Sequence, residues 1–129
     1  MRVVRTSLAI VALTSALVGP LAAAPATDDR LTLTFATCAG RYSAAMEHAW
    51  LMGRDGALHE ARRAGMVSLV EATMGPGSGR IVLARRIEAK AALAVLLARA
   101  SFGGDATVTR RAGMRANRLL AACDALLLG

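Results

Sequence analysis

This chain of 129 residues lacks several sequence motifs that indicate a particular cofactor or catalytic reaction. There is no C-x-x-C-H, which argues against covalently attached haem, and no C-x-x-C, the spacing of many thiol–disulfide oxidoreductases. The segment GPGSGR at 75–80 lacks the G-K-[ST] ending of a phosphate-binding loop. HEARR at 59–63 is not the H-E-x-x-H of zinc proteases. The sequence therefore predicts no cofactor and no catalytic set.

Runs of alternating β-branched or aromatic residues are also scarce, which argues against a sheet. Only LTLTF at 31–35 alternates; elsewhere the apolar residues recur at helical spacing. Glycine-bearing segments interrupt this spacing at 53–56, 75–79 and 103–104. The interruptions predict four helices, at 32–52, 57–74, 80–101 and 106–127, with Asp55, Ser78 and Asp105 as helix N-caps. Because such short connections make neighbouring helices antiparallel, we expect an all-α, up-down-up-down four-helix bundle.

The first 26 residues have the composition of a secretory signal peptide. Arg2 and Arg5 precede an apolar run, and small residues surround Ala26. Cleavage after Ala26 would leave one four-helix domain, 27–129, in the periplasm. The alternative is an uncleaved leader that anchors the protein in the membrane, but glycine and proline interrupt the apolar run, which favours cleavage.

The only two cysteines lie on apolar stripes of the first and last predicted helices. The first stripe is Leu31, Phe35, Cys38, Tyr42, Ala45, Ala49 and Met52, and the second is Val108, Ala112, Ala116, Leu119, Cys123 and Leu126. In an up-down-up-down bundle the start of the first helix and the end of the last helix meet at one end. We therefore expect a structural Cys38–Cys123 disulfide, which suits an exported chain too small to be held by its core alone.

A polar cluster is predicted inside the bundle. Projection of the third helix at 100° per residue gives an apolar arc that contains Glu88 and the residues Ile81, Ala84, Ala91, Val95, Ala98 and Phe102. A carboxylate in a core needs a partner, and the expected heights bring Arg41, Tyr42 and Arg115 close to Glu88. We expect these four residues to form a buried cluster that fixes helix register; an enzyme would need an open pocket around Glu88.

Two histidines provide weak candidates for a metal site. His48 and His59 flank the first connection, and the expected hairpin would let the two imidazoles approach each other. Methionine and histidine are ligands of copper in exported carriers. Without a third ligand at a defined spacing, however, the sequence favours hydrogen-bonded or solvated histidines over a metal site.

Positive charge is concentrated in the second half of the chain. The chain carries 16 Lys and Arg against 9 Asp and Glu, for a net charge of +7. The predicted third and fourth helices present the basic residues Arg85, Arg86, Lys90, Arg110, Arg111 and Arg118. For an exported protein such a face fits an acidic protein or an anionic envelope component, and not nucleic acid. The alternative is a solvent-exposed surface that binds no partner and whose basic residues are mostly arginine.

The segments CAGRYSAAMEHAWLM at 38–52 and RIEAKAALAVLLARASF at 86–102 resemble a group of small exported helical proteins of alphaproteobacteria. The resemblance covers the first and third predicted helices. It implies a helical protein of a Gram-negative envelope and brings no activity with it. The resemblance suggests Arg41, Glu47, His48, Trp50 and Glu88 as the residues that distinguish this group of proteins.

The sequence thus predicts an exported, periplasmic, non-enzymatic binding or accessory protein. Its binding surface would be the basic face of the last two helices or a groove beside Trp50. The alternative function is a periplasmic metal-handling protein that uses His48 and His59 together with methionine side chains. A hydrolytic or redox enzyme ranks third.

Overall fold

The computed structural model describes residues 27–128, and the predicted leader lies outside the described residues. The described part contains four α-helices and no strand: α1 (Thr27–Leu51), α2 (Ala57–Thr73), α3 (Gly79–Phe102) and α4 (Ala106–Leu128). The all-helical prediction is confirmed. None of these helices is long and apolar enough to cross a lipid bilayer.

The largest difference in helix boundaries is at the start of α1, which begins five residues before the predicted position. The alternating LTLTF segment is helical, and the hydroxyls of both its threonines find acceptors there. The Thr32 hydroxyl donates to the carbonyl oxygen of Thr73 in α2 at 2.9 Å, whereas Thr34 bonds within its own helix. The hydroxyl of Thr34 donates to the carbonyl oxygen of Arg30 at 2.9 Å, and that of Thr37 donates to Leu33 at 2.8 Å. A threonine that bonds the carbonyl four residues back is compatible with helical backbone.

The three predicted N-caps behave differently. Asp105 caps α4 as expected, because its carboxylate accepts a hydrogen bond from the backbone N–H of Val108 at 2.8 Å. Asp55 accepts from the N–H of Ala57 at 2.9 Å, although Gly56 occupies the N-cap position of α2. Ser78 occupies the N-cap position of α3 as expected, but its side chain does not cap the helix, since its hydroxyl donates to the carbonyl oxygen of Gly75.

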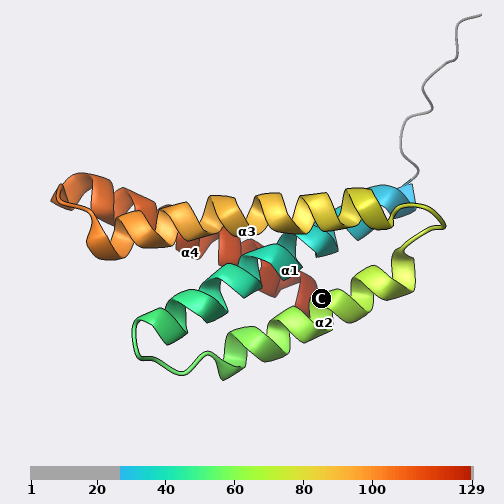
Figure 1. Cartoon of the computed structure of the whole chain (residues 1–129), viewed down its shortest axis with the longest axis horizontal. Helices are drawn as coiled ribbons and strands as arrows, with labels where there is room; N and C mark the ends of the chain where they lie inside the picture. The colour runs from blue at the N-terminus through green and yellow to red at the C-terminus, as the bar shows by residue number, and fades with distance from the viewer. Residues whose placement is uncertain (1–26, 129) are drawn as a thin grey trace, which may run out of the picture.

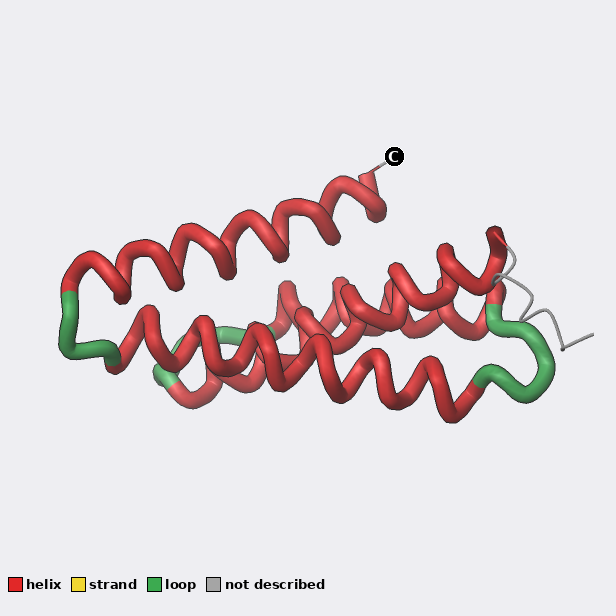
Figure 2. Tube along the Cα trace, turned by 90° about the horizontal axis from the view of Figure 1, so that it is seen from above, coloured by secondary structure: helices red, strands yellow, loops and turns green. Residues whose placement is uncertain are grey.

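The four helices alternate in direction along the chain, and α1 lies at the centre of their packing (Figure 1). α1 packs against α2 on one side and against α3 on another, while α4 packs mainly along α3. Although α2 and α3 are consecutive, both pack on α1 and hardly on each other. Seen from above, α4 lies along one side of the molecule (Figure 2), and its last turns are joined to α1 by the Cys38–Cys123 disulfide and to α2 by an ion pair between Arg62 and Asp124.

The core runs along the predicted stripes of α1 and α4. The central residues of both stripes are buried or partly buried, whereas the end residues Leu31, Met52, Val108 and Leu126 are exposed. Tyr42, Met66, Leu93 and Cys123 are the largest fully buried side chains.

The predicted core arc of α3 is wrong, because this arc faces solvent. The buried residues of α3 are Val82, Ala89 and Leu93, on the opposite side of the helix. Ile81 and Phe102, which were expected inside, are 61% and 63% exposed. Both sides of α3 are apolar, but Val82 and the leucines at 93, 96 and 97 offer more area to bury than the alanines of the predicted arc.

Candidate functional site

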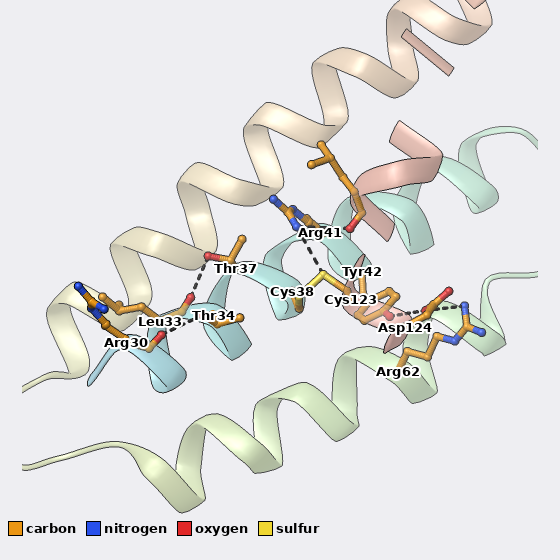
Figure 3. Close-up of a disulfide and its surroundings, with 11 residues drawn as sticks. Arg30, Leu33, Thr34, Thr37, Cys38, Arg41, Tyr42, Arg62, Cys123 and Asp124 are labelled. Atoms are coloured by element: carbon orange, nitrogen blue, oxygen red, sulfur yellow. Dashed lines mark hydrogen bonds and ion pairs between the residues drawn. A yellow bond between two sulfur atoms is a disulfide. The ribbon is translucent and has the colours of Figure 1, made fainter. Parts of the chain in front are cut away.

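The predicted disulfide is present and links the first helix to the last. The Cys38 and Cys123 sulfurs are 2.04 Å apart, across a separation of 85 residues, and both side chains are buried (Figure 3). The Arg41 guanidinium lies over the bridge, where Nη1 approaches the carbonyl oxygen of Leu119 at 3.3 Å and the Cys123 sulfur at 3.6 Å. Burial lowers the pKa of Arg41.

The predicted Glu88 cluster does not form. The Glu88 side chain is 72% exposed and pairs with Arg85, three residues earlier on α3, at 3.6 Å. Arg115 is also exposed. Arg41 and Glu88 do line one shallow cavity of about 160 Å³ between α1, α3 and α4, but no ion pair joins them. The prediction failed because it placed the wrong side of α3 against the core.

A different, partly buried polar network lies next to the disulfide. The Tyr42 hydroxyl donates to the Asp124 carboxylate at 2.5 Å, and Asp124 also pairs with Arg62 of α2 at 3.0 Å (Figure 3). Burial and the hydrogen bond to Asp124 raise the pKa of Tyr42, so the hydroxyl keeps its proton and remains a donor. This network joins α1, α2 and α4. It could have been anticipated from the disulfide, because Asp124 directly follows Cys123 and Tyr42 lies one turn after Cys38.

The two histidines line one cavity of about 260 Å³, together with Ala45, Ala49, Arg54, Asp55, Leu97, Asn117 and Leu120. His48 Nε2 shares a hydrogen bond of 2.9 Å with the Ser101 hydroxyl. The His59 ring stacks on Tyr42 with centroids 6.5 Å apart, and its buried Nδ1 has no hydrogen-bond partner. Between residues 27 and 128 no three His, Cys, Asp or Glu side chains are grouped to hold a metal. Metal binding at this pair therefore stays a prediction.

Protonation of His48 and His59 should make the folded protein less stable in mild acid. Burial lowers the pKa of each imidazole below the ordinary 6.5, with Arg54 adding to the effect at His48 and Arg62 at His59. As the pH falls below about 6.5, the unfolded chain takes up protons before the folded chain does, so the free energy of unfolding decreases. Above about pH 6.5 both histidines are neutral in the folded and the unfolded chain, and the free energy of unfolding no longer depends on their protonation.

We expect denaturant unfolding to show this loss between about pH 7 and pH 5, the range where histidine titrates. His59→Phe keeps the ring against Tyr42 but cannot be protonated, and should flatten the profile more than His48→Gln, because His59 is the more deeply buried. An unchanged slope in the double variant would contradict this assignment.

A second concave site is cationic. Arg63 of α2 and Arg86 and Lys90 of α3 line a groove of about 300 Å³. The remaining lining residues are Gly40, Ser43, Met46 and Glu47 of α1 and Leu83 and Ile87 of α3. Lys90 Nζ pairs with Glu47 at 2.6 Å, and the buried Nε of Arg63 has no hydrogen-bond partner. Glu47 thus balances one of three cations, and the groove keeps an excess of positive charge.

The predicted basic face is divided between separate places. Arg86 and Lys90 face the cationic groove, whereas Arg85 lines the cavity shared by Arg41 and Glu88. Arg110, Arg111 and Arg118 are exposed along α4. Sequence reasoning missed Arg63, because only the packing of α2 and α3 on α1 brings it beside Arg86. Trp50, beside which a groove was expected, is about half exposed and lies over Gly56 at the first connection.

Comparison with protein-family models, with curated proteins and with solved structures finds no match to this chain. The function of this protein is therefore inferred from the geometry of its candidate sites.

Proposed function

We propose that the protein is an exported, non-enzymatic binding or accessory protein whose cationic groove receives an acidic segment of a partner protein. The observation that carries this proposal is the convergence of Arg63, Arg86 and Lys90, from two helices, on one groove with a single acidic residue. Arginine forks bind carboxylates through paired hydrogen bonds.

The shape of the groove favours a flexible acidic chain over a flat membrane surface. Arg63 is partly buried in the groove, which a side-chain carboxylate of a flexible segment can enter more readily than a planar array of lipid headgroups. The exposed side chains of Leu83 and Ile87 border the groove and could contact apolar residues next to the acidic ones. Such a mixed surface is typical of a protein-binding site.

Export is the second part of the proposal. The arginine-led apolar segment in residues 1–26 has the order of a signal peptide, and a disulfide persists in an oxidising compartment. We place the mature protein in the periplasm, with cleavage after Ala26. The absence of a bilayer-spanning helix from the described residues is compatible with this placement.

Binding can be tested with an oligoglutamate peptide followed by fluorescence anisotropy. We expect Arg63→Gln with Arg86→Gln to weaken binding by about tenfold or more, because charge-assisted hydrogen bonds are lost in a recessed site. Arg110→Gln with Arg111→Gln removes the same charge from α4 and should change the affinity much less. An equal loss of affinity in both double variants would show that binding depends only on net charge, and would contradict the proposed groove. Tighter binding to phosphatidylglycerol vesicles than to the peptide would favour an anionic lipid and contradict the protein-partner proposal.

A further inference from the structure

The outward side of α3 carries a second contact surface, independent of the cationic groove. Along this side the residues are spaced alternately three and four apart, and all of them are exposed. We call this set the outer seam; it consists of Ile81, Ala84, Glu88, Ala91, Val95, Ala98 and Phe102. α3 lies along the upper edge of the molecule in Figure 1 and crosses the front in Figure 2, so the other helices leave this side open.

The spacing of the outer seam is that of a coiled-coil contact. A strict alternation of three and four residues keeps a narrow stripe facing one partner helix over several turns. α3 already has a separate core face, formed by Val82, Ala89 and Leu93, so the seam is not needed for the fold. Ile81, Val95 and Phe102 are 61%, 49% and 63% exposed. Large apolar side chains aligned on an exposed stripe mark an interaction surface.

We propose that the outer seam binds the outer seam of a second copy of this chain, with the two α3 helices antiparallel. In the seam, large residues occupy one heptad position, Ile81, Glu88, Val95 and Phe102, and alanine occupies the other at 84, 91 and 98. An antiparallel pair brings the first position of one helix against the second position of the other. Every large side chain then faces an alanine, which lets the helices approach closely and interdigitate.

One register uses nearly the whole seam. When Val95 lies against Ala91 of the second copy, Phe102 lies against Ala84 and Glu88 against Ala98 of that copy. By the two-fold symmetry each of these contacts occurs twice. A parallel pair would instead place each seam residue against its own copy. The two Phe102 rings would crowd each other, the two Glu88 carboxylates would repel each other, and alanine facing alanine would leave gaps.

Charge selects the same antiparallel register. Glu88 is the only acidic residue of α3, and among residues 27–128 of its own copy it pairs only with Arg85, at 3.6 Å and largely in water. Arg99 directly follows Ala98, so the proposed register brings Arg99 of the second copy beside Glu88. Two symmetric Glu88–Arg99 pairs would flank the contact. Opposite charges beside a coiled-coil seam set the orientation and register of the helices.

Sedimentation velocity of the purified, oxidised protein over a range of concentrations tests the proposal without any ligand. We expect a reversible monomer–dimer equilibrium. Ala91→Arg puts two charges into the centre of the contact and should raise the dissociation constant by at least ~100-fold. Because Ala91 is exposed in the single chain, the thermal unfolding of the variant monomer should stay close to that of the wild type. Ala122→Arg, on an exposed site of α4, is the matched control and should dimerise normally.

The register is tested by charge reversal. Glu88→Arg and Arg99→Glu should each weaken the dimer, and the double variant should restore it, because the pairs are reciprocal. A protein that stays monomeric at all concentrations, or a dimer that Ala91→Arg leaves intact, would overturn the proposal. Restoration failing in the double variant would overturn the antiparallel register. None of these outcomes depends on the cationic groove, so the two proposals fail separately.

Discussion

Replacing both Cys38 and Cys123 with alanine should lower the free energy of unfolding by about 4 kcal/mol, because a bridge across so long a separation removes much chain entropy from the unfolded state. The closed segment spans 85 residues, nearly the whole described chain. A domain of this size has a total stability of only about 5–10 kcal/mol. Urea unfolding followed by circular dichroism measures the difference. Alanine is used because serine would leave buried hydroxyls without partners.

The loss should fall most heavily on the end of α4. α4 packs mainly on α3, and its attachment to α1 depends on the disulfide, the Tyr42–Asp124 hydrogen bond and Arg41. Hydrogen exchange should therefore become faster in the last turns of α4 than in α1. The reduced wild-type protein is the control and should unfold at nearly the same urea concentration as the alanine variant. An oxidised wild type no more stable than the variant would contradict this role of the bridge.

Replacing Gly40 with alanine should also destabilise the protein strongly, by about 2 kcal/mol net. A Cβ at this position would lie inside van der Waals contact of the carbonyl oxygen of Arg86 and 3.1 Å from the backbone nitrogen of Lys90. Backbone atoms of a neighbouring helix cannot move aside as a flexible side chain can. α1 and α3 would have to separate along the largest contact of the fold. This cost exceeds the gain in helix propensity, which alone would favour alanine by about 1 kcal/mol.

Gly65→Ala is the matched control, because it makes the same change inside α2. There the nearest atom to an added Cβ is a Leu127 methyl carbon at 3.7 Å, an ordinary contact. This variant should be slightly more stable than the wild type, while Gly40→Ala is less stable. Equal urea midpoints for the two variants would show that the close approach of α1 and α3 does not occur.

Sequence periodicity predicted the elements whose two sides differ clearly. In α1, large residues such as Phe35 and Tyr42 share one side with Cys38, and the observed core follows that side. Pairing the two cysteines needed only the count of helices and their alternation. α3 could not be oriented in the same way, because Val82 and Leu93 on one side compete with Ile81 and Phe102 on the other. Which of these two sides of α3 is buried depends on where α1 packs against the helix.

The candidate sites were less predictable because they depend on that orientation. The approach of His48 and His59 followed from one short connection, and the structure places both beside the same cavity. The Tyr42–Asp124–Arg62 network and the cationic groove each combine residues from helices distant in the sequence. Arg63 carries no local signal that separates it from the neighbouring Arg62. Its position in the groove follows from the packing of three helices.

One disulfide ties the first helix of this four-helix protein to the last, and we propose that the protein is exported. The most direct test is the intact mass of the protein recovered from its native envelope fraction after thiol alkylation. We predict a chain that begins at Thr27, lacks two hydrogens and carries no alkyl group. A chain that retains residues 1–26 and gains two alkyl groups would contradict both export and the bridge.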